Sequence, residues 1–483
     1  MINIICTCIK YINIVLIVVY TFYCFSIFGY QDPQKKHSIL VVQNIVMYLF
    51  QFTAYTTMYL KTKEIQYLII YIALTVMIAI TIAFYVNLYP NVSRLILNNM
   101  CMLFTVGIVM ISRLSFNLAT KQFFVFCVSM IVSLFVPVII RKAKFLSKPL
   151  YRYVYAGIGC AALFSVLILA QTSYGAKLGF SIMGFSIQPS EFVKIVYVFF
   201  VASCLYYSVR FKNVVITTSL AALQVLILVI STDLGAAVIL FVVYLVMLYV
   251  ATRNIFYMSS GLVAGSVASV IAYKLFGHVQ VRVEAWKDPF AAYSGGGYQV
   301  SQSLFAIGTG GWLGMGLYQG APETIPVAES DFIFSAISEE LGLIFGLCVI
   351  LICVSCYVMF LNIAMQISNM FYKLIALGLG TCYIFQVFLT IGGVTKFIPS
   401  TGVTLPLVSY GGSSLLSTLI MFAIIQGLYI LREDEEEEIE RIRNHNIRRE
   451  RAQEERIAKK SPERNPTGRK QPVKKRANRQ REL

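Results

Sequence analysis

The stretch from Gly277 to Gly342 reads GHVQVRVEAWKDPFAAYSGGGYQVSQSLFAIGTGGWLGMGLYQGAPETIPVAESDFIFSAISEELG. In a chain that is otherwise almost all apolar, it is the one long segment that combines glycine, tyrosine, glutamine, arginine and carboxylates. Seven of the eleven carboxylates that precede Glu433 lie in it. Charge is costly near a membrane, so this concentration predicts where the polar chemistry takes place.

The composition places the chain in a membrane. Hydrophobic residues make up 58% of its 483 residues and charged residues only 13%, and apolar runs of roughly 20 residues recur throughout. This excludes a soluble globular protein and predicts an all-α polytopic membrane protein. The net charge of +17 comes mostly from short inter-helix loops and from the tail, where anionic membrane lipid accounts for it, so we expect no nucleic-acid partner.

Hydropathy divides the chain into three parts. Residues 1–94 hold about three apolar segments, near 11–30, 39–60 and 65–89, which predict extra N-terminal transmembrane helices. Residues 95–431 hold ten more, which predict a ten-helix core with an outer loop at 277–330; they lie near 95–112, 122–140, 151–170, 189–209, 213–230, 234–251, 255–276, 331–360, 371–394 and 409–431. Residues 432–483 read as a charged, largely disordered tail.

The basic segments predict the orientation. Residues 141–148, 210–212, 251–254 and the tail fall on one side of a ten-helix core, which should be the cytoplasmic side and should hold the C-terminus. The loop 277–330 then faces outward, together with three shorter connections at 171–188, 231–233 and 395–408.

Two polar features lie at the first and second of these shorter connections. In IQPSEFVK, Glu191 and Lys194 are three residues apart and share one helical face, so they form either an ion pair that satisfies two buried charges or part of a site. In STDLGAA, Asp233 precedes the helix that begins at Leu234, and helix capping alone would explain an aspartate there.

The outer loop supplies the candidate acid–base group. Asp331, next to Glu329, is either a helix cap or a general base whose pKa is raised in a cavity of low dielectric. Arg282, Lys287 and Lys194 are the cations available for an anionic substrate. Glu339 and Glu340 should lie further along the helix that Asp331 begins, inside the hydrocarbon zone, where they are either paired or line a polar cavity.

Two glycine-containing stretches complete the outer face. The run from Gly308 to Gly320 predicts flexible backbone that either approaches a ligand's phosphates or is only a flexible loop, and it lacks the ending of a nucleotide P-loop. Residues 397–414, FIPSTGVTLPLVSYGGSS, predict a structured re-entrant segment, because irregular backbone at membrane depth must line protein or water.

Taken together, these motifs resemble the SEDS family, the RodA, FtsW and SpoVE proteins of bacterial cell-wall synthesis. The matching stretches, in order, are SRLSFNLATKQF, IQPSEFVK, STDLGAA, GGGYQVSQSLFAIGTGGWLGMGL, ESDFIFSAISEELG and IPSTGVTLPLVSYGGSS. The segment YGAKLGFSI departs from the family pattern, since it retains only Lys177 of the usual basic residues and lacks the tryptophan.

The resemblance implies an inverting glycosyltransferase that polymerises lipid II at the outer face of the bacterial cytoplasmic membrane, for elongation, division or sporulation. A class B penicillin-binding protein is the implied partner. Asp331 matches the family's essential aspartate and is our candidate base. The substrate-binding candidates lie in the matched motifs or beside them: Glu191, Lys194, Asp233, Arg282, Gln299, Gln302, Glu329, Ser409 and Tyr410.

One cofactor suits these residues. A hard divalent cation, Mg²⁺ or Mn²⁺, would match the carboxylates and the lack of a Cys/His cluster, although no metal-binding residues can be named. The competing function is a flippase for the same lipid-linked precursor, which should carry its essential charges near the bilayer midplane. A non-catalytic scaffold would make the acidic residues dispensable.

Overall fold

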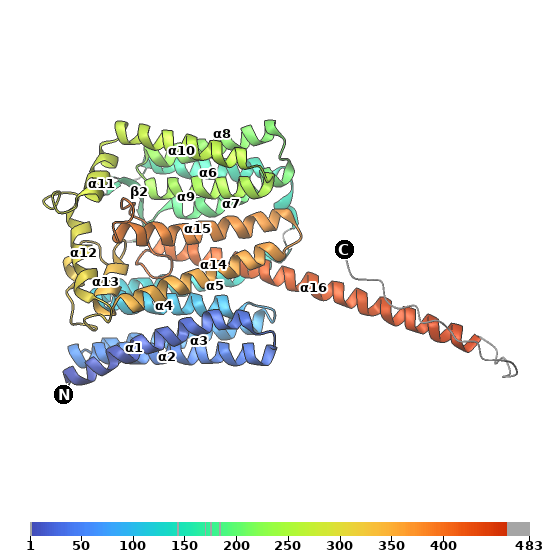
Figure 1. Cartoon of the computed structure of the whole chain (residues 1–483), viewed down its shortest axis with the longest axis horizontal. Coiled ribbons are helices and arrows are strands. Elements are labelled where there is room, and N and C mark those ends of the chain that lie inside the picture. Colours follow the sequence, from blue (N-terminus) through green and yellow to red (C-terminus); the bar gives the residue numbers. More distant parts are fainter. Residues whose placement is uncertain (1, 143, 170, 174–175, 183–184, 461–483) are drawn as a thin grey trace, which may run out of the picture. The chain divides into compact units, whose positions relative to one another are not determined.

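The computed structural model describes residues 2–142, 144–169, 171–173, 176–182 and 185–460. Among them are 13 helices that are long and apolar enough to cross a membrane, and Figure 1 shows most of them side by side in one bundle. The prediction of an all-α polytopic membrane protein is confirmed. The chain divides into two units, Met1–Arg432 and Glu433–Leu483.

Three helices precede the core. They are α1 (Ile2–Ser26), α2 (Pro33–Thr62) and α3 (Gln66–Leu88). The side chain of Asp32 caps α2 by accepting a hydrogen bond of 2.9 Å from the Gln34 amide, and a proline at the first helical position suits that start.

The N-terminal helices enclose α4 (Arg94–Leu114), in which every residue from Leu95 to Ser112 is buried. Polar side chains of α4 bond to α1 and α2 across this contact. Asn99 accepts a hydrogen bond from the Tyr20 hydroxyl at 3.1 Å, and Thr105 accepts one from Gln51 at 2.9 Å. Because lipid cannot satisfy such groups, these bonds tie the N-terminal helices to the core.

The rest of the bundle follows the hydropathy pattern. Its helices are α5 (Phe116–Lys142), α6 (Tyr151–Leu169), α7 (Pro189–Tyr207), α8 (Phe211–Ile230), α9 (Leu234–Thr252), α10 (Ile255–Leu275), α14 (Leu343–Gln366), α15 (Met370–Val394) and α16 (Gly412–Lys460). Helix α15 packs against α7, α9 and α14. Helix α10 has no buried residue and packs mainly on α9.

A small antiparallel sheet lies between α6 and α7, where the sequence predicts only a short connection. Its strands are β1 (Gln171–Ser173), β2 (Ala176–Ile182) and β3 (Phe185–Ile187), in the order β1-β2-β3. Lys177, the one basic residue that this segment retains from the family pattern, lies on β2 opposite Thr172 of β1.

The helix predicted over 331–360 is broken. Helix α13 (Ile333–Glu340) ends before Gly342, whose φ of +94° places it in the left-handed region, and α14 begins afterwards at Leu343. The expectation of one continuous helix over 331–360 is therefore wrong, although Glu339 and Glu340 do lie further along the helix that follows Asp331. The physical reason is the glycine, which allows a backbone angle that ends the helix.

The glycine-rich run packs against this break. The amides of Leu343 and Ile344 donate hydrogen bonds to the carbonyls of Gly311 and Trp312, at 3.0 and 3.2 Å. A Cβ on Gly342 would lie 2.5 Å from the Gly314 amide nitrogen. The glycines thus permit close backbone contact, so the run is not the flexible loop that its composition suggested. Its approach to a ligand's phosphates stays a prediction.

Segment 277–330 contains more regular structure than the sequence predicts. It holds α11 (Gly277–Lys287), α12 (Tyr298–Gly310) and a 3-10 turn, η3 (Pro322–Thr324). In the second unit, residues 433–460 are helical, and the expectation of disorder for 461–483 lies outside the described residues.

Candidate active site at one end of the bundle

Asp331 lies in the turns that lead into α13. A Cβ built on Gly402 would lie 3.4 Å from Oδ2 of Asp331 and 3.8 Å from Nη2 of Arg282. Gly402 also has φ +68°, which disfavours any residue with a side chain. The carboxylate and the guanidinium therefore come together beside a position whose backbone angle favours glycine.

Arg282 comes from α11, and its Nη1 donates a hydrogen bond to the Ser400 carbonyl at 3.2 Å. Burial lowers the pKa of Arg282, while the nearby carboxylates of Asp331 and Asp233 act in the opposite direction. One guanidinium therefore interacts with carboxylates from two different parts of the chain.

The environment of Asp331 favours its protonated form. Burial raises the pKa of this carboxyl above its ordinary value, and the neighbouring charge of Glu329 raises it further. The hydrogen bond from Ser330 and the charge of Arg282 lower it without cancelling the increase. A carboxylate with a raised pKa holds an abstracted proton more readily, as a general base must.

Ser409 and Tyr410 hold the backbone that carries Asp331. The Ser409 hydroxyl donates to the Ser330 carbonyl at 2.5 Å and accepts from the Leu405 amide at 2.8 Å. The Tyr410 amide donates to the Glu329 carbonyl at 2.7 Å. These contacts position the residues beside Asp331, whereas the sequence had suggested that Ser409 and Tyr410 contact substrate.

Asp233 both caps a helix and binds the QPSE motif. Its Oδ1 accepts from the Ala236 amide at 3.1 Å, so it caps α9. Its Oδ2 accepts from the Ser190 hydroxyl at 2.7 Å and from Gln188 Nε2 at 3.2 Å. Asp233 thus joins the starts of α7 and α9 close to Arg282.

Glu191 and Lys194 form a buried ion pair of 2.9 Å. Lys194 also donates to Gln386 Oε1 at 2.7 Å, and Glu191 accepts from the Ser417 hydroxyl at 2.9 Å. Lys194 is only 2% exposed. In this arrangement it cannot reach a ligand at the surface, but Gln386 connects it to the Thr404 carbonyl, two residues from Gly402.

The other candidates contribute less. Gln302, on α12, donates to the Tyr293 hydroxyl at 2.8 Å, and Gln299 is partly exposed on the same helix. In the described part of the chain, neither glutamine bonds to Asp331 or Arg282. Glu329 is partly exposed and acts on Asp331 through its charge.

Sequence reasoning missed a second charged cluster. Arg113, at the end of α4, forms ion pairs with Glu340 at 2.9 Å and Glu323 at 3.2 Å, and its guanidinium lies 4.3 Å from the centre of the Tyr318 ring. The Tyr318 hydroxyl lies 2.6 Å from that of Tyr67 on α3, which links the cluster to the N-terminal helices. The one available indication was a lone arginine in the SRLS motif at the end of an apolar run.

Burial alters the proton affinity of this cluster. It raises the pKa of Glu340 to about 7, even though Arg113 lowers it, and it also raises the pKa of Tyr318. One oxygen each of Glu339 and Glu340 is buried without a hydrogen-bond partner. Burying an unpaired carboxyl oxygen costs less free energy when the group is protonated and neutral, which agrees with the raised pKa of Glu340.

The divalent cation that the sequence suggested stays a prediction. Within the described ranges, no three His, Cys, Asp or Glu side chains gather into a metal-binding group. Arg282 already places a positive charge beside the carboxylates of Asp331 and Asp233.

Comparison with known proteins identifies the family. The model of the FtsW, RodA and SpoVE proteins, described as cell cycle protein, matches residues 92–433. The chain belongs to this family. The resemblance of the motifs to the SEDS family is thereby confirmed. The three N-terminal helices lie outside the matched residues.

SEDS relatives with names align over parts of the chain. The peptidoglycan glycosyltransferase RodA of Mycobacterium tuberculosis is 39% identical over 267 residues, covering 52% of this chain and 57% of that protein. Stage V sporulation protein E of Bacillus subtilis is 34% identical over 264 residues, covering 52% and 68%. A probable peptidoglycan glycosyltransferase FtsW of Aliivibrio salmonicida is 30% identical over 349 residues, covering 66% and 84%. The chain thus spans little more than half the length of the mycobacterial relative.

Solved SEDS-like structures share the fold. A chain of a peptidoglycan synthase complex aligns with a TM-score of 0.61 at 22% identity, over 71% of this chain and 98% of that one. The rod shape determining protein RodA of Thermus thermophilus aligns with a TM-score of 0.52 at 20% identity, over 70% and 96%. This protein is accordingly a multi-pass bacterial membrane protein.

Proposed function

We propose that this protein is a peptidoglycan glycosyltransferase that polymerises lipid II into β-1,4-linked glycan strands. The observation that carries the proposal is the meeting of Asp331 and Arg282 beside Gly402, whose φ of +68° lies in the left-handed region. Membership of the SEDS family and the names of the aligned relatives support the same reaction class.

In this reaction the donor is an undecaprenyl-diphosphate-linked glycan with an α-anomeric bond. The 4-hydroxyl oxygen of the acceptor sugar forms a bond to the anomeric carbon, and its proton passes to the Asp331 carboxylate. The bond between that carbon and the diphosphate oxygen breaks, and the electron pair leaves with the diphosphate. A single in-line displacement inverts the α bond to β, so one base is enough and no covalent enzyme intermediate forms.

Arg282 is placed to interact with the leaving diphosphate, because a guanidinium binds phosphate oxygens with two parallel hydrogen bonds. Lys194 remains enclosed in its ion pair, so we assign it a positioning role through Gln386 and Thr404. Asp233 fixes the adjoining helix starts.

The site works at the outer face of the cytoplasmic membrane in this proposal, with the C-terminus inside. The basic loops at the opposite end of the core support that orientation. The aligned chain from a peptidoglycan synthase complex supports a class B penicillin-binding protein as partner.

The test is lipid II polymerisation by the purified full-length protein in liposomes, with and without a class B penicillin-binding protein. Wild type should make glycan strands, and Asp331→Asn, which keeps the shape but not the basicity, should make fewer by a factor of at least about 100. The matched control is Glu284→Gln, an exposed carboxylate on α11 two residues from Arg282, which should leave polymerisation unchanged.

Full activity of Asp331→Asn would refute the assignment of the base. If wild type makes no strands even with the partner, but moves lipid II across the bilayer, the flippase is the correct function. Loss of polymerisation in Glu284→Gln as well would show that the effect is not specific to Asp331.

A further inference from the structure

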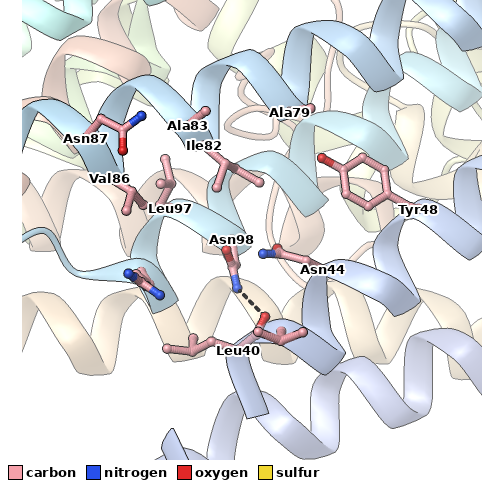
Figure 2. A pocket seen from close by; sticks show the side chains of 12 residues that line it. Leu40, Asn44, Tyr48, Ala79, Ile82, Ala83, Val86, Asn87, Leu97 and Asn98 are labelled. Atoms are coloured by element: carbon pink, nitrogen blue, oxygen red, sulfur yellow. Dashed lines mark hydrogen bonds between the residues drawn. The ribbon is translucent and has the colours of Figure 1, made fainter. Parts of the chain in front are cut away.

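A cavity of about 360 Å³ lies between the N-terminal helices and the core, shown in Figure 2. Helices α2 and α3 supply nine of its twelve lining residues, all outside the SEDS match, and α4 supplies the other three. It lies at the far end of the bundle from Asp331. Helix α4 runs from Arg94 at the cavity to Arg113 beside Glu340, a length of about 29 Å at roughly 1.5 Å per residue.

The lining is amphipathic. Aliphatic side chains, among them Ile82 and Val86, form much of it. In Figure 2 Asn87 and Tyr48 lie toward opposite ends, with Asn44 and Asn98 between them. An apolar pocket with a few convergent polar groups is typical of a site for a small or amphiphilic molecule.

Two of the polar groups have no partner. Arg94 is only partly exposed, yet it makes no ion pair or side-chain hydrogen bond within the described residues. Oδ1 of Asn44 is buried and accepts no hydrogen bond. Asn98 differs, because it donates to the Leu40 carbonyl at 3.1 Å. Buried polar atoms are almost always paired, so the unpaired Asn44 oxygen indicates a ligand that carries a donor. The Arg94 guanidinium in the same cavity favours a ligand that is also anionic.

The surroundings point to the bilayer as the source of that ligand. Next to the cavity residues, α2 and α3 carry exposed apolar side chains. Ile45 on α2 is 53% exposed and Phe84 on α3 is 52% exposed. Apolar surface of this kind on a membrane helix faces lipid tails. The exposed Lys35 and Lys36 begin α2 about one turn before Leu40, so the end of the bundle at which the cavity lies is positively charged. Positive charge at the end of a membrane helix attracts anionic headgroups.

We propose that this cavity binds the headgroup of an anionic glycerophospholipid from the leaflet at that end of the bundle. The phosphate lies against the Arg94 guanidinium, a headgroup hydroxyl donates to Asn44 Oδ1, and the acyl chains leave along α3 past Ile82 and Val86. The site is shared between the N-terminal helices and the first core helix, and it does not depend on the glycosyltransferase reaction.

The test is native mass spectrometry of the purified full-length protein in detergent, titrated with phosphatidylglycerol and, in parallel, with phosphatidylcholine. We expect wild type to bind one phosphatidylglycerol more tightly than phosphatidylcholine, and Arg94→Gln to weaken phosphatidylglycerol binding by about tenfold, the loss expected for one hydrogen bond to a charged group. Arg94→Lys should retain most of the affinity. Ala83→Phe fills the cavity from α3 without touching a charge, so it should also weaken binding.

Arg210→Gln is the matched control, because Arg210 is an exposed arginine outside the cavity at the start of α8 and should not affect lipid binding. Unchanged binding in Arg94→Gln or Ala83→Phe would overturn the proposal, as would equal binding of the two lipids. Displacement of phosphatidylglycerol by millimolar inorganic phosphate alone would assign the site to free phosphate instead.

Discussion

The buried carboxyl of Glu340 should make the stability of the protein depend on pH, and Glu340→Gln should remove that contribution. Burial raises its pKa from 4.5 to about 7 although Nε of Arg113 lies 2.9 Å away. The folded state therefore keeps the proton at pH values where the unfolded chain has released it. The resulting stabilisation is complete below about pH 4.5 and is lost as the pH rises through about 7. Such a shift corresponds to about 3 kcal/mol, and Glu340 is fully buried, so solvent screening does not reduce it.

The assay is thermal unfolding of wild type and Glu340→Gln in one detergent, across this pH range. Other titrating groups are common to both proteins, so the difference between their midpoints isolates Glu340. Wild type should lose several degrees relative to the variant between the acid and the neutral end. The exposed Glu284→Gln serves as control and should follow wild type at every pH. Parallel curves for wild type and Glu340→Gln would refute the argument, and so would a difference that grows toward acid pH.

Three further outcomes follow from the site. Arg282→Gln should move the acid limb of the pH–rate profile for glycan polymerisation to higher pH. The reason is that Arg282 lowers the pKa of Asp331, and the base works only when deprotonated. An acid limb at the same pH as in wild type would contradict that coupling. Gly402→Val should reduce polymerisation at least about tenfold in protein that elutes normally on gel filtration, with Gly402→Ala less affected, because any side chain there is strained and lies against Asp331. Lys194→Met should lower the free energy of unfolding by roughly 3 kcal/mol or more, because it leaves Glu191 buried and without its ion-pair partner. Adding Glu191→Gln should restore most of that loss, as measured by thermal unfolding. No recovery would mean that the pair has another role.

Hydropathy predicted the membrane helices because the bilayer leaves the backbone few alternatives. Residues 234–251 and 371–394, for example, were expected as helices, and α9 and α15 occupy 234–252 and 370–394. One boundary shifted because a cap lies outside the apolar run: the Asp32 side chain starts α2 at Pro33, well before residue 39. A hydropathy average over apolar residues does not detect a polar capping residue that lies before them.

The site was predicted less completely, because its partners are far apart in sequence. The pairing of Glu191 with Lys194 follows from helical spacing, and the cap at Asp233 follows from local sequence. The contact of Arg113 with Glu340 spans 227 residues, and nothing local to either residue specifies it. The break at Gly342 was missed for the same reason, since its partner Gly314 lies 28 positions earlier in the chain and the residues around the break are apolar enough to read as one helix.

The enclosure of α4 also bears on how the protein is made. A helix with Asn98, Asn99, Thr105 and Ser112 along its sides would enter lipid with several unsatisfied groups. During synthesis, however, the N-terminal helices leave the ribosome first, and α1 and α2 carry the tyrosine and glutamine side chains that bond to α4. The chain thus supplies partners for its first core helix before that helix emerges, so shortening the protein to the family core would leave α4 without them.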